Sequence, residues 1–222
     1  MTTPLRVAYE HVAFDLDGTL IDSRADLAGS VNEVLRRLGR PEIRPETLYG
    51  YVGDGARVLV QRALADAPAE EIETGIAWFM EYYGAHLLDA TRPYPGIREM
   101  LDALAARSVR LSVLTNKPVG LSERILDGLG LGDRFVGVIG GDSLPTRKPD
   151  PAGLEHLRRL TGTPAERTLL VGDSGIDVHT ARAGRVDFCG VGWGLVPENL
   201  RAANPARIID DPRELVTLVD GR

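Results

Sequence analysis

Short runs of consecutive apolar residues, mostly three or four long, recur along the chain. Runs in which apolar residues do not alternate with polar ones are typical of parallel strands that are covered by helices on both faces. The runs predict five strands and a sixth, shorter one, at residues 12–14, 111–114, 136–139, 168–171, 188–191 and 208–209.

Between residue 95 and the end of the chain, these runs alternate with segments whose apolar residues recur at helical spacing. The three clearest segments carry Ile97, Met100, Leu101 and Leu104, then Leu121, Ile125 and Leu129, then Leu154, Leu157 and Leu160. An alternation of strand and helix predicts an α/β fold built on a Rossmann-like, doubly wound parallel sheet.

Residues 21–92 break this alternation. Helical spacing of apolar residues predicts helices around 27–38, directly after Gly53-Asp54-Gly55, and around 72–87, with no strand-like run between them. The segment 92–96 (Arg-Pro-Tyr-Pro-Gly) has the composition of a linker. We therefore predict an α/β core of residues 1–20 and 93–222, and an all-helical insertion of residues 21–92, with any hinge near 21–23 and 91–93.

Charge and cysteine content narrow the possible partners and location. The formal net charge of the 222 residues is -6, which gives no electrostatic reason to bind nucleic acid or an anionic membrane. Cys189 is the single cysteine and lies in an apolar run, so we expect a buried, unreactive thiol rather than a disulfide or a nucleophile. With no signal-peptide pattern and no long apolar span, we expect a cytoplasmic protein.

Polar residues that can carry chemistry follow several of the predicted strands. They are Asp15, Asp17 and Thr19, then Thr115, Asn116 and Lys117, then Asp173, Ser174 and Asp177, with Lys148 preceding the helix near residue 151. Each group alone is also an ordinary turn or helix cap. Because the carboxyl ends of parallel strands meet at one edge of a sheet, where ligands bind, the groups together predict a shared site.

Several carboxylates at one edge repel one another unless a cation lies among them. Mg²⁺ is the expected cofactor, because it prefers oxygen ligands and binds one or two carboxylates beside a phosphate. Asp15 and Asp173 can supply these carboxylates, with the backbone carbonyl of Asp17. A zinc site is disfavoured, because the four histidines (His11, His86, His156, His179) show no ligand spacing.

The spacing of Asp15 and Asp17 suits phosphoryl transfer. Residues i and i+2 of an extended segment point to the same side, so both carboxylates can face a substrate, one as nucleophile and one as acid or base. A carboxylate nucleophile forms an aspartyl-phosphate. Gly18 allows the chain to turn sharply after them.

These segments resemble the four motifs of the haloacid dehalogenase superfamily. The motifs are Phe14-Asp15-Leu16-Asp17-Gly18-Thr19-Leu20, Thr115, Lys148, and Gly172-Asp173-Ser174-Gly175-Ile176-Asp177, in the family's order. The helical insertion resembles the α-helical cap of that superfamily. The resemblance implies a Mg²⁺-dependent phosphomonoester hydrolase that works through an aspartyl-phosphate intermediate.

The resemblance also implies a role for each motif residue. Asp15 is the nucleophile and a metal ligand, and Asp17 is the acid and then the base, with its carbonyl on the metal. Thr115 and Lys148 bind the phosphoryl group. Asp173 binds the metal, and Asp177 orders the metal's surroundings.

Further stretches resemble phosphoglycolate phosphatases and also recur in related sugar-phosphate, pyrophosphate and nucleotide phosphatases. They are 52–56 (Val-Gly-Asp-Gly-Ala), 93–96 (Pro-Tyr-Pro-Gly), 114–118 (Leu-Thr-Asn-Lys-Pro) and 192–194 (Gly-Trp-Gly). The second aspartate, Asp17, argues against a dehalogenase, and Thr19 argues against a β-phosphoglucomutase-like mutase. A phosphate-sensing relic and a receiver-like domain remain alternatives, which the filled catalytic positions and the motif order disfavour.

The expected substrate is a small phosphorylated metabolite, and the expected assembly a monomer or homodimer. Thr115, Asn116, Lys148 and Gly18 are candidates for substrate binding. Arg57, on the helix opened by the Gly53-Asp54-Gly55 loop, can contact a second anionic group, or it can face solvent. Lys117 presents the same two alternatives.

Overall fold

The computed structural model describes residues 9–221; residues 1–8 and 222, which we assigned to the core, lie outside the described residues. Six parallel strands form one sheet in the order β5-β4-β1-β6-β7-β8. They are β1 (His11–Phe14), β4 (Arg110–Leu114), β5 (Val138–Ile139), β6 (Thr168–Gly172), β7 (Asp187–Val191) and β8 (Ile208–Ile209). The predicted doubly wound α/β fold is confirmed, and β1 lies at the centre of the sheet between β4 and β6.

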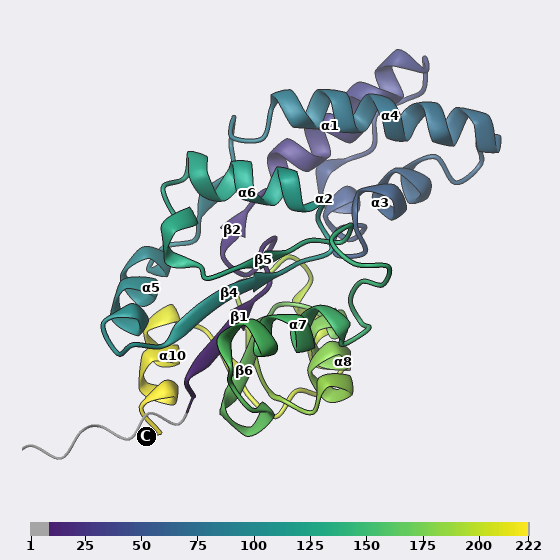
Figure 1. The fold of residues 1–222 in the computed structure, drawn as a ribbon. Coiled ribbons are helices and arrows are strands. Elements are labelled where there is room, and N and C mark those ends of the chain that lie inside the picture. The colour runs from purple at the N-terminus through teal and green to yellow at the C-terminus, as the bar shows by residue number, and fades with distance from the viewer. Residues whose placement is uncertain (1–8, 222) are drawn as a thin grey trace, which may run out of the picture.

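Helices cover both faces of the sheet (Figure 1). Val12 and Phe14 of β1 pack in the cluster that contains the buried faces of α5 (Ile97–Ala105), α6 (Val119–Gly128) and α10 (Pro212–Val219). Ala13, between them, packs with buried residues of α7 (Ala152–Thr161) and α8 (Gly175–Gly184). The consecutive apolar residues of β1 thus serve two cores, as a strand buried on both faces requires.

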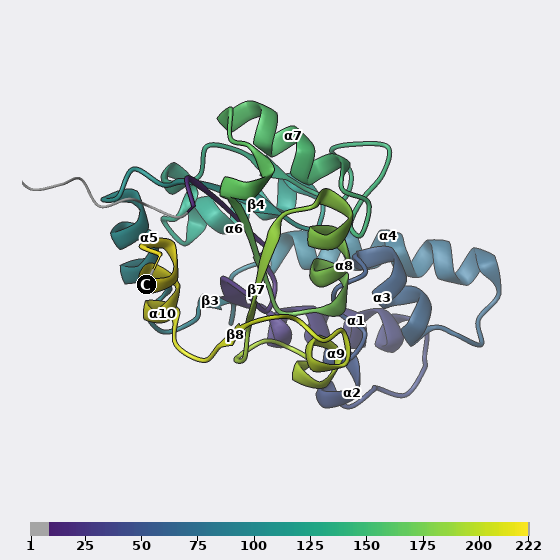
Figure 2. The same ribbon diagram turned by 90° about the horizontal axis from the view of Figure 1, so that it is seen from below.

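Four helices follow the first strand: α1 (Arg24–Arg37), α2 (Pro45–Tyr49), α3 (Ala56–Ala63) and α4 (Ala69–Ala85). Figures 1 and 2 show them gathered at one end of the molecule, away from α5 and α10 at the other end. The three expected helices are confirmed, and the five-residue α2 was missed because it is too short to show a periodic pattern. The division into two domains stays a prediction.

The structure adds a pair of very short strands where the chain enters and leaves the helical insertion. β2 (Ile21–Asp22) pairs antiparallel with β3 (Arg92–Pro93). The prediction that 21–92 contains no strand was wrong at these positions, because two residues carry no readable alternation. The pairing brings the two crossing segments side by side.

The remaining differences are small. The predicted strand at 136–139 is reduced to Val138–Ile139, and Leu160 of α7 is 56% exposed rather than part of the core. A further helix, α9 (Pro197–Ala202), and two 3₁₀ turns, Gly132–Arg134 and Ala165–Arg167, complete the described elements. None of the helices within residues 9–221 is both long and apolar enough to cross a membrane. Cys189 is buried in β7 as a free thiol, as expected.

Candidate active site

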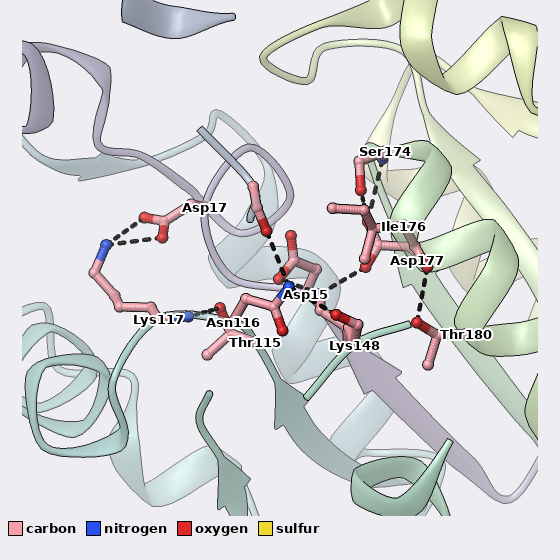
Figure 3. A network of polar contacts seen from close by, with 11 residues as sticks. Asp15, Asp17, Thr115, Asn116, Lys117, Lys148, Ser174, Ile176, Asp177 and Thr180 are labelled. Atoms are coloured by element: carbon pink, nitrogen blue, oxygen red, sulfur yellow. Dashed lines mark hydrogen bonds and ion pairs between the residues drawn. The ribbon is translucent and has the colours of Figure 1, made fainter. Parts of the chain in front are cut away.

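The carboxyl ends of β1, β4 and β6 bring the predicted motif residues together (Figure 3). Asp15 directly follows β1, Thr115 follows β4, and Asp173 follows β6. Lys148 reaches the same place from the loop before α7. All four side chains are buried, so the site is a part of the core rather than a surface turn. Ordinary turns or helix caps would not require these side chains to be buried together, so that alternative does not explain the arrangement.

Three carboxylates form a cluster that can hold a cation. One oxygen from each of Asp15, Asp173 and Asp177 lies within 4.8 Å of the others, and all three side chains are buried. The Lys148 ammonium donates to Asp15 Oδ1 at 2.8 Å and to Asp177 Oδ1 at 2.6 Å. One buried ammonium is thus set against three buried acidic groups.

The electrostatics of the cluster show a shortage of positive charge. Burial raises the pKa of Asp15, against the opposing charge of Lys148, and burial raises the pKa of Asp173 as well, with Asp15 and Asp177 adding to the effect. Burial works against the charged form of Lys148, but Asp15 and Asp177 outweigh it and hold its pKa above the usual value. A hard divalent cation with oxygen ligands would supply the missing charge, so these residues fit Mg²⁺.

Local structure fixes the orientation of two of these carboxylates. Asp177 lies in the first turn of α8, where its Oδ2 accepts hydrogen bonds from the backbone N–H (3.2 Å) and the hydroxyl (2.5 Å) of Ser174. Asp173 Oδ2 accepts from the Leu195 N–H at 2.8 Å. Each of the two carboxylates is therefore held by a donor outside the cluster.

Asp173 also needs space on two sides, and two glycines provide it. A Cβ on Gly18 would lie 2.2 Å from Asp173 Oδ2, and one on Gly194 would lie 2.3 Å from Asp173 Cβ. Gly18 has a φ of +87°, which disfavours other residues independently. Gly18, a candidate for substrate binding, thus lies against Asp173, and its contact with substrate stays a prediction.

The side chain of Asp17 points away from the carboxylate cluster. Its two oxygens accept from the Lys117 ammonium at 2.7 and 2.8 Å, and its Oδ1 also accepts from the Ser23 hydroxyl at 2.5 Å. Lys117 and Ser23 are both buried, and Lys117 is therefore not the solvent-facing cation that we left open. Figure 3 shows Asp17 and Lys117 on the opposite side of Asp15 from Lys148 and Asp177.

Thr115 and Asn116 occupy the end of β4. The Thr115 hydroxyl accepts from the Lys117 N–H at 3.2 Å, so its own O–H can donate to a bound oxygen. The Asn116 amide donates to the carbonyls of Gly53 and Lys148, both at 3.1 Å. Asn116 thus ties β4 to the helical insertion and to the Lys148 loop.

A pocket of about 40 Å³ opens beside Asp15 and Asp17, between the core and the helical insertion. Its core side is lined by Asp15, Asp17, Thr115, Asn116, Lys117, Pro118 and Leu121, and its other side by Leu27, Val52, Gly53, Gly55, Ala56, Leu59, Phe79 and Tyr83. This volume holds roughly three water molecules, so this conformation suits a small ligand.

The structure does not bring Arg57 to this pocket. Its guanidinium pairs with Glu73, with Nη2 2.9 Å from Oε2, and both side chains are largely exposed. Of the two alternatives that we left open for Arg57, the structure shows the solvent-facing one. The loop before it does reach the pocket, through Gly53 and Gly55.

Sequence reasoning missed Tyr83, Ser23 and Gly194 as residues of the site. Tyr83 falls on the apolar face of α4, which reads as core, and its place in the pocket arises only from the packing of the helical insertion on the core. For Lys117 the sequence does hold a sign of a role in the site, because Lys117 and Lys148 are the only lysines among its 26 basic residues.

Known proteins resemble this chain in sequence and in fold. Residues 12–191 match the family described as haloacid dehalogenase-like hydrolase. A phosphoglycolate phosphatase from Pseudomonas savastanoi pv. phaseolicola is 42% identical over 212 residues, which cover 92% of this chain and 78% of that protein. One from Chromobacterium violaceum is 41% identical over 198 residues, covering 87% and 89%.

A solved structure agrees with these relatives. The crystal structure of a predicted phosphoglycolate phosphatase from Haemophilus somnus superposes with a TM-score of 0.91 at 32% identity, covering 96% of this chain and 99% of that one. The family match spans most of the chain, and the site has the acidic and basic residues of the four motifs in one place. The chain belongs to the haloacid dehalogenase-like hydrolases.

Proposed function

We propose that this hydrolase is a Mg²⁺-dependent phosphatase that cleaves 2-phosphoglycolate, with Asp15 as the nucleophile. The observation that carries the proposal is the buried arrangement of Asp15 beside Asp173 and Asp177, with the Lys148 ammonium between Asp15 and Asp177. The relatives named phosphoglycolate phosphatase support the substrate. The small pocket supports a substrate with few atoms beyond its phosphate.

Asp15 would attack the phosphorus atom and form an aspartyl-phosphate as the ester oxygen leaves. The Lys148 ammonium and the Thr115 hydroxyl would neutralise and orient the transferring oxygens, since such transfer depends mostly on positioning and charge. Mg²⁺ held by Asp15 and Asp173, with the Asp17 carbonyl, would add positive charge at the phosphoryl group. Asp177 would keep Lys148 and its neighbours in place.

Asp17 would protonate the leaving oxygen of glycolate and then take a proton from the water that attacks the aspartyl-phosphate. Water attack releases phosphate and returns Asp15 to its carboxylate form. In the structure the Asp17 carboxylate is held by Lys117 and Ser23 beside the pocket, two residues from Asp15. Turning of the helical insertion toward the core on substrate binding would exclude water from these steps.

A panel assay tests the proposed function. The protein is incubated with Mg²⁺ and 2-phosphoglycolate, pyrophosphate, a sugar phosphate, a nucleotide or p-nitrophenyl phosphate, with Asp15→Asn as the control. We expect the highest kcat/KM for 2-phosphoglycolate and no turnover above background by the variant. Absence of hydrolysis by the wild type, or equal turnover by the variant, would refute the proposal. A monomeric or homodimeric state and a cytoplasmic location stay predictions.

A further inference from the structure

The distribution of lysine in this chain is strongly uneven. Of 26 basic residues, only Lys117 and Lys148 are lysines, and the other 24 are arginines. The two lysine side chains are 4% and 3% exposed, and each pairs with one aspartate of the first motif, Lys117 with Asp17 and Lys148 with Asp15. Lysine carries a compact charge that fits where the planar guanidinium does not. Its restriction to these two places marks both as parts of the site.

Fold stability does not explain the pair formed by Lys117 and Asp17. Removing both charges from water costs several kcal/mol, and the attraction between them returns about that much. The Lys117 ammonium lies 2.7 and 2.8 Å from the two Asp17 oxygens and lines the pocket. The ammonium therefore remains a fixed positive charge at the wall of the pocket.

The Lys117 ammonium retains donor capacity. An ammonium has three N–H donors, and Asp17 Oδ1 and Oδ2 accept two of them. Lys117 also lies over the ring of Tyr83, 4.9 Å from its centroid. Among the described residues that line the pocket, Lys117 is the only one with a positive charge. A second acidic group on a substrate bound at Asp15 has no other cation to meet there.

The hydroxyl of Tyr83 provides a second donor at the same place. It is buried, and its one polar neighbour among the described residues is the Lys117 ammonium, which can only donate, so the Tyr83 O–H has no acceptor within residues 9–221. Burial raises the pKa of Tyr83 to about 12, with the Lys117 charge opposing, so the hydroxyl keeps its proton. A buried O–H without an acceptor destabilises the folded protein, and a bound acceptor would remove this cost. The neighbouring wall, Leu27, Leu59 and Phe79, is apolar.

We propose that Lys117 and Tyr83 bind the second acidic group of the substrate, the carboxylate of a short phosphate ester, and so determine its specificity. This inference rests on the proposed function. The Lys117 ammonium and the Tyr83 O–H donate to the carboxylate, while one Lys117 N–H remains on Asp17 and leaves the other Asp17 oxygen to carry the proton for the leaving group. Esters without the carboxylate leave both donors unpaired in an enclosed, mostly apolar pocket.

A kinetic comparison of 2-phosphoglycolate with ethyl phosphate, which lacks the carboxylate, tests the inference. The measured quantity is the ratio of kcat/KM for the two esters. In Lys117→Met we expect this ratio to fall by about 10- to 100-fold, as for loss of a hydrogen bond to a charged group. In Tyr83→Phe we expect a fall of about 3- to 10-fold. Tyr82→Phe removes a hydroxyl from the same helix outside the pocket and is the matched control.

The result decides between recognition of substrate and support of Asp17. A ratio that is unchanged in both Lys117→Met and Tyr83→Phe overturns the inference, as does an equal loss on the two esters, which would show that Lys117 acts only by holding Asp17. If the wild type hydrolyses neither ester, the proposed function fails, and the binding measurement below still decides the role of Lys117.

Binding can be followed at the lysines themselves. Protein labelled with ¹³C-lysine has two Cε signals, from Lys117 and Lys148, which Lys117→Met assigns. With Mg²⁺ and the Asp15→Asn variant, we expect both esters to shift the Lys148 signal and only 2-phosphoglycolate to shift the Lys117 signal. A Lys117 signal that does not respond to 2-phosphoglycolate, or that responds equally to both esters, contradicts the inference.

Discussion

Asp173 shows how single residues set the geometry of this site. Its carboxylate is bounded by Gly18 on one side and Gly194 on the other, and the Leu195 N–H fixes one of its oxygens. These neighbours come from two distant segments, at residue 18 and at residues 194–195, which meet only in the folded chain. Small changes in them should therefore act on the proposed Mg²⁺ site before they act on the fold.

Gly18→Ala adds one carbon atom beside Asp173 and tests whether this contact controls the binding of Mg²⁺. The added Cβ would lie 2.2 Å from Asp173 Oδ2, so the carboxylate must move. We expect the apparent affinity for Mg²⁺, measured from the metal dependence of hydrolysis and by calorimetry, to fall by about 10-fold or more. The positive φ adds about 1–2 kcal/mol of backbone strain.

Gly39→Ala is the matched control for Gly18→Ala. Gly39 also has a positive φ, +67°, but a Cβ there meets no atom within 4 Å. The Gly39→Ala variant should therefore have the backbone strain of a positive φ without a loss of Mg²⁺ affinity. An equal loss of affinity in both variants would show that the contact with Asp173 is not the cause.

At the scale of elements, the two crossings between the core and the helical insertion are joined to each other. Strands β2 and β3 pair with each other, and next to them the buried carboxylate of Asp26 in α1 forms a second connection. It accepts from the Ala90 N–H at 2.9 Å, and from the Thr91 N–H and hydroxyl at 2.8 and 2.7 Å. We therefore expect any closing motion to turn on the segments next to the core, 18–20 and 94–96, rather than at 21–23 and 91–93.

Asp26→Ala removes this connection. It leaves the N–H of Ala90 and the two buried donors of Thr91 without an acceptor, and we expect the free energy of unfolding to fall by about 2–4 kcal/mol. Urea denaturation followed by circular dichroism measures the change. Asp102→Ala is the control, because it removes an exposed aspartate side chain from α5. It should lower the free energy of unfolding by less than about 1 kcal/mol. Similar losses in the two variants would mean that Asp26 does not tie the crossings together.

At the scale of the whole molecule, a buried histidine links stability to pH. His11 of β1 is fully buried, with Nε2 2.7 Å from Ser112 Oγ of β4 and Nδ1 3.4 Å from Thr161 Oγ1 of α7. Burial, and then the charges of Arg110 and Arg158, lower the pKa of His11 to about 4. The folded protein therefore holds this imidazole neutral where the unfolded chain binds a proton.

The consequence is a loss of stability in mild acid. Above about pH 6.5 the group is neutral in both states, and between pH 6.5 and 4 only the unfolded state gains the proton, so the free energy of unfolding falls by up to about 3 kcal/mol. Urea titrations at pH 7 and 4.5 should show this fall in wild type relative to His11→Gln. His156→Gln, at an exposed position of α7, is the control. Parallel pH profiles for wild type and His11→Gln would contradict the assignment.

Much of this fold was predictable because its signals are local in the sequence. A strand buried on both faces must be apolar throughout, and the chemistry follows directly at its end, as Asp15 follows β1 and Asp173 follows β6. The place of Tyr83 in the pocket was not predictable in this way, and for Lys117 the sequence left substrate contact and a solvent-facing position open. Both places depend on how α4 lies over the end of β4, which no spacing within either segment records. Arg57 shows the reverse, since it lies next to pocket residues but its side chain pairs with Glu73 at the surface.

The central claim is that Asp15 carries the phosphoryl group. A rapid-quench experiment with ³²P-labelled 2-phosphoglycolate and Mg²⁺, followed by peptide mapping, tests it most directly. We predict alkali-labile phosphate on the peptide that contains Asp15 during turnover, and none in Asp15→Asn. Turnover without protein-bound phosphate, or phosphate on another residue, would contradict the account.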